Sequence, residues 1–70
     1  MSHIQSVLFD KNYWDIFDSI NWLHYHHLYP IKSPHITKKF IRYRIKDPKY
    51  FRRLRTIKTK DHLDIIVGFL

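Results

Sequence analysis

Four short stretches of the chain mix hydrophobic and polar residues as half-buried strands do, and one longer stretch repeats hydrophobic residues at helical spacing. The four stretches are rich in β-branched and aromatic residues, which favours strands. We predict these strands over residues 3–9, 36–45, 52–58 and 63–69. The helical stretch lies between the first two, at residues 11–27. The order β-α-β-β-β indicates a small α+β domain, in which one helix packs on one face of an antiparallel sheet.

Residues that begin or end helices flank the helical stretch. Asp10 suits the N-cap, and Asp15 lies near the first turn, where the helix dipole favours a negative charge. Pro30 and Pro34 prevent the helix from continuing and mark an extended connection to the second strand. Beyond that strand, residues 47–51 predict a turn that includes one helical turn.

The helical stretch holds more aromatic residues than one buried stripe can accommodate. The stripe predicted to face the sheet consists of Tyr13, Ile16, Phe17, Ile20, Leu23, His24 and His27. A second face carries Trp14, Asp18, Trp22 and Tyr25. Either connecting segments fold over these rings, or the second face contacts a protein partner. Since two-fold pairing is the commonest form of oligomer and enlarges a small core, we predict a homodimer through this face.

The chain has 70 residues, no cysteine, one glycine and a net charge of +7. This length allows a single domain, residues 1–70, and the lack of cysteine excludes disulfide scaffolds and cysteine-based zinc fingers. A lone glycine, Gly68, excludes glycine-rich phosphate loops. No apolar run approaches the roughly 20 residues of a membrane-spanning helix, and no secretory signal pattern opens the sequence. We therefore expect an intracellular protein without a membrane partner.

The positive charge is concentrated in the middle of the chain. Residues 31–60 contain twelve Lys and Arg and a single Asp, whereas residues 1–30 and 61–70 each carry a net charge of −2. A segment with a net charge of +11 attracts polyanions. The alternative is a solvated basic surface that serves only solubility.

Alternation along the second predicted strand separates its basic residues from its apolar ones. Ile41 and Tyr43 are expected to meet the helix, and Arg53 and Arg55 share one face of the third predicted strand. If these two strands are neighbours, four or five cations converge. The predicted nucleic-acid-binding residues are Lys38, Phe40, Arg42, Arg44, Arg53 and Arg55. Guanidinium groups offer paired donors to phosphates, so we predict binding with little sequence specificity, with DNA favoured over RNA.

Two alternatives accompany this prediction. The Arg side chains could cover apolar surface with their stems while their charged ends stay solvated. The protein could also be an interaction adaptor, whose aromatic helix face contacts a host or virion protein.

The histidines do not form a recognisable metal motif. His24 and His27 could share one ion, but a closed zinc site needs about four ligands, and no cysteine is present. We expect these histidines to lie at the negative end of the helix instead. The sequence also lacks a nucleophile elbow, paired catalytic carboxylates and a zinc-protease motif. We therefore expect no catalytic activity, no metal or other cofactor, and no small-molecule substrate.

Several aromatic and basic residues form a pattern of short motifs along the chain. They are Trp22-Leu23-His24, Phe40-Ile41-Arg42-Tyr43-Arg44, Asp47-Pro48 and Phe51. This pattern resembles small basic domains of large eukaryotic DNA viruses, of the marseillevirus-like and phycodnavirus-like kind. The chain departs from the family at residues 26–28, where a glycine is usual, and at Ile45-Lys46. The resemblance implies a compact α+β fold, no known activity, and a place in the viral factory, the host nucleus or the virion.

Overall fold

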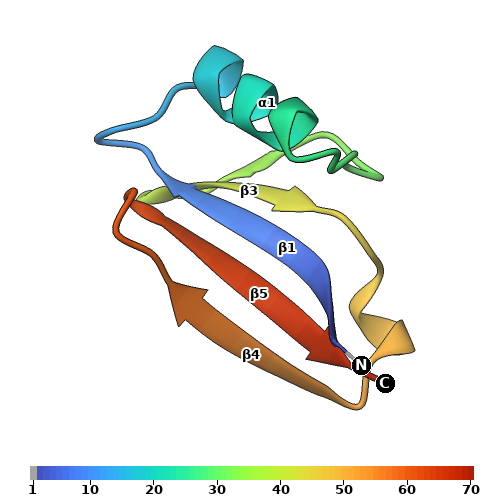
Figure 1. Cartoon of the computed structure of the whole chain (residues 1–70). Coiled ribbons are helices and arrows are strands. Elements are labelled where there is room, and N and C mark those ends of the chain that lie inside the picture. Colours follow the sequence, from blue (N-terminus) through green and yellow to red (C-terminus); the bar gives the residue numbers. More distant parts are fainter. Residues whose placement is uncertain (1) are drawn as a thin grey trace.

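A computed structural model describes residues 2–70, which form one five-stranded sheet and one α-helix (Figure 1). The elements are β1 (Ser2–Asp10), α1 (Ile16–Tyr25), β2 (His35–Ile36), β3 (Phe40–Arg44), the 3₁₀ helix η1 (Pro48–Tyr50), β4 (Arg53–Lys58) and β5 (Leu63–Phe69). The strand order is β2-β3-β1-β5-β4, and every neighbouring pair is antiparallel. The helix lies on one face of this sheet, which confirms the predicted α+β class.

The second predicted strand, residues 36–45, is in fact two strands joined by a tight turn. The Thr37 N–H donates to the Phe40 carbonyl at 2.8 Å, and the Thr37 Oγ1 accepts from the Phe40 N–H at 2.9 Å. The Lys11 ammonium holds this turn from outside by donating to the Thr37 carbonyl at 3.1 Å. Lys38 therefore lies in the β2–β3 turn and not on the face of β3, as the sequence pattern had indicated.

The helix begins later than predicted. Asp15, and not Asp10, is the N-cap of α1, since its carboxylate accepts from the Asp18 N–H at 2.7 Å. Asp10 instead organises a turn, because its backbone carbonyl accepts from the N–H groups of Tyr13 and Trp14. The aspartate side chains favour a cap or a turn equally well, and the sequence alone did not separate the two roles.

The end of the helix is a Schellman motif with histidine in the usual place of glycine. The Leu28 N–H donates to the Leu23 carbonyl at 2.8 Å, and the His27 N–H donates to the His24 carbonyl at 3.0 Å. Between these bonds, His27 has a φ of 58°, in the left-handed region. The helix therefore ends before His27, which the sequence pattern had placed inside it.

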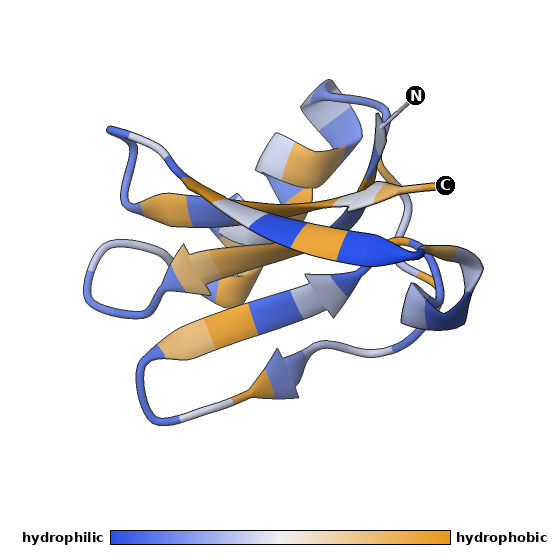
Figure 2. Ribbon diagram, turned by 90° about the horizontal axis from the view of Figure 1, so that it is seen from below, coloured by the Kyte–Doolittle hydropathy of each residue, from blue (hydrophilic) through white to orange (hydrophobic). Residues whose placement is uncertain are grey.

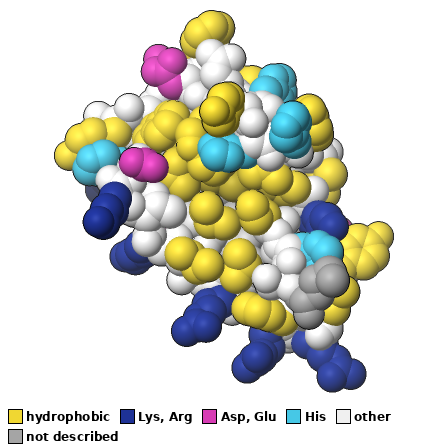
Figure 3. Space-filling model, in the orientation of Figure 1, with side chains coloured by type: hydrophobic (Ala, Val, Ile, Leu, Met, Phe, Trp, Pro, Cys, Tyr) yellow, Lys and Arg dark blue, Asp and Glu magenta, His cyan; other side chains and the backbone are white. Residues whose placement is uncertain are grey.

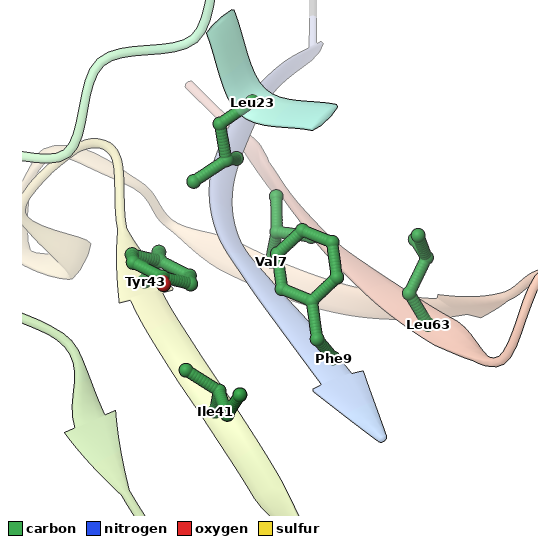
Figure 4. Close-up of a cluster of buried hydrophobic side chains, with 6 residues drawn as sticks. All are labelled: Val7, Phe9, Leu23, Ile41, Tyr43 and Leu63. Atoms are coloured by element: carbon green, nitrogen blue, oxygen red, sulfur yellow. The ribbon is translucent and has the colours of Figure 1, made fainter. Parts of the chain in front are cut away.

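The core lies between α1 and the central strands (Figure 4). It consists of Val7, Phe9, Leu23, Ile41, Tyr43 and Leu63, all at most 3% exposed. One polar contact joins the helix to β3, because the Ser19 and Tyr43 hydroxyls lie 2.7 Å apart in a buried hydrogen bond. Ser19 is small, so α1 approaches the sheet closely at this point.

α1 turns a different face to the sheet from the predicted one. Of the predicted stripe, Leu23 is buried and Ile20 is partly buried, but Phe17 is 73% exposed. The rings of Trp14 and Trp22 pack edge-on against Phe9, at centroid distances of 4.9 and 5.6 Å. The two indoles thus complete the core. The other aromatic rings of residues 11–27, those of Tyr13, Phe17 and Tyr25, face solvent. Tyr13 is 62% exposed and lies in the turn before the helix, where helical spacing does not apply.

A candidate nucleic-acid interface

The sheet has two different faces. The helix face lies under α1 and carries Val7 and Phe9, whereas the open face has no helix over it. Because successive residues of a strand point to opposite faces, the register assigns each strand residue to one face. Open-face residues of the strands include Ser6, Leu8, Phe40, Arg42, Arg44, Leu54, Thr56, Lys58, Asp64, Ile66 and Gly68. Figure 2 shows the alternation of hydrophilic and hydrophobic residues along the strands.

The residues of β3 have the orientation that the sequence predicted. Tyr43 pairs with Val7 and Ile41 pairs with Phe9, so both apolar side chains lie on the helix face. Arg42 and Arg44 consequently point to the open face, together with Phe40. Both Arg side chains are half-buried along the sheet surface.

The residues of β4 do not join them, and the predicted convergence of cations is wrong. Arg55 pairs with Val67, two residues along β5 from Ile65, which pairs with Val7. Arg53 and Arg55 therefore lie on the helix-face side of the sheet, beyond the reach of α1. Two whole strands, β1 and β5, also separate β3 from β4. Figure 3 shows basic side chains along the lower edge of the molecule, where Figure 1 places β4.

A different group of cations does converge on the open face. A hollow of about 150 Å³ is lined by Lys32, Ser33, His35, Arg42 and Arg44, which we call the basic hollow. None of these five residues is acidic. Lys32 and His35 were not among the predicted site residues, although the positively charged segment begins at Lys32.

Backbone contacts fix the walls of the basic hollow. The Ile31 N–H donates to the Arg44 carbonyl at 2.9 Å, which holds the connection after α1 against β3. In β2, His35 pairs directly with Arg42, so the two side chains share the open face. Among the side-chain hydrogen bonds of residues 2–70, none involves a guanidinium group. The donors of Arg42 and Arg44 are therefore available to a ligand.

Apolar side chains continue the open face from the basic hollow toward β4. Leu8 pairs with Arg42 on one side, and Ile66 lies on the adjacent strand opposite Thr56. At the far end, the Phe51 ring packs over Gly68: a Cβ on this glycine would lie 2.3 Å from the Phe51 Cγ. The open face thus combines a basic end with apolar side chains, among which Asp64 pairs with Leu8 and Lys58.

The second face predicted for the helix is divided between core and solvent. Trp14 packs in the core and its indole N–H donates to the Asp61 carbonyl at 2.9 Å, and Trp22 contacts Phe9. Tyr25 is 81% exposed, and Asp18 is exposed in the first turn of α1. Both tryptophans pack partly against the core, and they also line a surface hollow of about 410 Å³ together with Asp61, so their part in a partner contact stays a prediction.

The histidines are distributed around the molecule and make packing contacts. The His62 ring stacks on the Tyr13 ring, with centroids 3.5 Å apart and planes 6° from parallel. The His26 ring lies against Trp22, with centroids 4.1 Å apart. Within residues 2–70, no three His or Asp side chains are grouped so that they could hold a metal ion. The described residues contain no helix that could serve as a membrane span.

Comparison of the chain with protein-family models, curated proteins and solved structures gives no match. The resemblance to small viral domains, carried by Trp22, Phe40 to Arg44 and Phe51, therefore stays a prediction.

Proposed function

We propose that this protein binds nucleic acid without catalysis, through phosphate contacts in the basic hollow. The observation that supports this proposal most directly is the pair Arg42 and Arg44, which point to one face of one strand beside Lys32 and His35. At about 3.4 Å per strand residue, the two Arg Cα atoms lie roughly 7 Å apart. Each guanidinium can therefore form paired hydrogen bonds with a different phosphate of one strand.

The rest of the open face favours a nucleic acid over a small anion. Phe40, Leu8 and Ile66 provide apolar surface next to the cations, on which unstacked bases could rest. This arrangement suits a single strand laid across the sheet better than a duplex, which would offer only its backbone. No element of the site encodes base-specific contacts, so little sequence preference is expected.

DNA remains favoured over RNA as the bound nucleic acid, and a viral source remains part of the proposal. The viral factory, the host nucleus and the virion are the proposed places of action, and they follow from the family resemblance alone. A homodimer also remains a proposal, for which Tyr25 and Asp18 are the remaining residues of the predicted contact.

The proposal is tested by fluorescence anisotropy with labelled single-stranded DNA over a range of salt concentrations. Contacts to about three phosphates predict a log–log salt slope of roughly −2 on a single strand. We expect Arg42→Glu with Arg44→Glu to abolish binding, because both phosphate contacts are replaced by repulsion.

The matched control is Arg53→Glu with Arg55→Glu. It changes the net charge by the same amount, but on the helix face of the sheet and not on the open face. This control should retain most of the affinity if the basic hollow is the site. Equal losses in the two double variants would show that only net charge matters and would overturn the proposal. Labelled RNA of the same sequence, measured in parallel, tests the preference for DNA.

A further inference from the structure

We propose that β4 is a docking edge, to which an extended acidic segment of a partner protein adds as a sixth strand. β4 is the outermost strand of the sheet and pairs only with β5, and all six of its residues are exposed. The opposite edge is different, because β2 has only two residues and directly follows Pro34. Among residues 2–70, β4 therefore provides the longer unprotected sheet edge.

The register shows which backbone groups of β4 are free. The Thr59 N–H donates to the Leu63 carbonyl at 3.1 Å, just beyond the turn end of the β4–β5 ladder. Because hydrogen-bonded pairs alternate along an antiparallel ladder, Arg53, Arg55 and Ile57 direct their N–H and C=O groups to β5. The residues between them, Leu54, Thr56 and Lys58, direct theirs outward. An added strand would pair with these three residues.

The side chains of β4 favour an acidic partner. The strand contains Arg53, Arg55 and Lys58 and no acidic residue. Leu54 and Ile57 are each 47% exposed, so they add apolar contact on alternate faces of the strand. Charge complementarity therefore selects a segment in which acidic and apolar residues alternate.

The surface is hollowed at the end of β4 that carries Arg53 and Arg55. Arg53, Leu54, Arg55 and Phe69 line a hollow of about 460 Å³. The Arg53 guanidinium lies over the Phe69 ring, 5.7 Å from its centroid. This contact limits the freedom of the Arg53 side chain and holds its guanidinium over the face of the sheet that Phe69 shares.

The same charges disfavour a second copy of the chain as the occupant. Two β4 strands side by side would bring two sets of Arg53, Arg55 and Lys58 together without a compensating carboxylate on either strand. Basic side chains on a sheet edge commonly prevent such self-pairing. The proposed docking edge is independent of the basic hollow, which lies at the other edge of the sheet.

The test uses fluorescence anisotropy of the full chain with a labelled peptide of alternating Glu and Val. We expect this peptide to bind, and a version with a central proline, which cannot form a continuous strand, to bind at least about tenfold more weakly. Thr56→Pro removes an outward N–H and leaves the ladder to β5 intact, so it should also reduce affinity by at least about tenfold. The matched control, Thr56→Val, keeps the N–H and should bind within about twofold of the parent chain. Circular dichroism confirms that each variant is folded.

A second variant keeps the test decisive if Thr56→Pro does not fold. Arg53→Glu with Arg55→Glu replaces exposed side chains. This double variant should bind the Glu-Val peptide more weakly and a Lys-Val peptide more tightly than the parent chain does. Equal binding of the peptides with and without proline, or unchanged affinity in folded Thr56→Pro, would overturn the proposal. A parent chain that is dimeric by light scattering, and becomes monomeric on Thr56→Pro, would show that a second copy occupies the edge instead.

Discussion

His27 has a left-handed backbone conformation at the C-terminal end of α1. Helices that end in a Schellman motif usually have glycine at this position. A side chain in this conformation is strained by contact between its Cβ and the backbone, by about 1 kcal/mol. We expect His27→Gly to raise the free energy of unfolding by about 0.5–1 kcal/mol, as measured by urea denaturation. The matched control is His24→Gly, inside the last helical turn, which should lower it by about 1 kcal/mol. A lower stability for His27→Gly would show that the imidazole makes a contact worth more than the strain.

Gly68 is the chain's single glycine, and its role is to admit an aromatic ring. Since an added Cβ would lie 2.3 Å from the Phe51 Cγ, Gly68→Ala must displace this ring from the open face. We expect a loss of about 1–3 kcal/mol in the free energy of unfolding. In a Phe51→Ala background the same substitution should cost much less, and a double-mutant cycle measures the difference. Additive effects of the two substitutions would contradict this contact.

The tryptophans matter at the level of the helix, because they determine which face of α1 meets the sheet. Trp22 packs on Phe9 and is partly buried, so Trp22→Ala should lower the free energy of unfolding by about 2–4 kcal/mol. Tyr25→Ala, three residues further along the same helix, removes a ring that is 81% exposed and should change stability by less than about 0.5 kcal/mol. Light scattering should show the parent mass for Trp22→Ala, whereas Tyr25→Ala should lower the mass if the proposed homodimer forms through Tyr25. A stable Trp22→Ala variant with a changed mass would indicate that the indole belongs to an interface.

The elements themselves were largely predictable from the sequence. Local residue patterns indicated the strands and the helix, and the range of β5 was predicted to the residue, because such patterns act over a few neighbours. The side of α1 that packs on the sheet was predicted wrongly. Helical spacing had been extended through Tyr13 and Trp14, which lie in a turn before the helix. Ser19 faces the sheet and its hydroxyl makes a buried hydrogen bond with that of Tyr43, a tertiary contact that helical periodicity does not report.

At the scale of the whole molecule, the candidate site could be predicted only in part. The orientation of Arg42 and Arg44 followed from alternation within one strand, and the structure has it as predicted. The position of Arg53 and Arg55 depends on strand order, which is set by pairings between distant segments. Convergence was expected only if these two strands are neighbours, whereas β5 and β1 lie between β4 and β3. Lys32 and His35 join the site through the same long-range geometry.

This strand order also has a consequence for how the protein folds. β5, the last strand along the chain, lies between β1 and β4, and its register runs from Phe69 opposite Ser2 to Leu63 opposite Phe9. The central ladder therefore closes a loop of nearly the whole chain, and this closure costs entropy before any contact is gained. Folding during synthesis on the ribosome has to wait until residues 63–69 are made, and refolding should be slower than that of helical proteins of equal size.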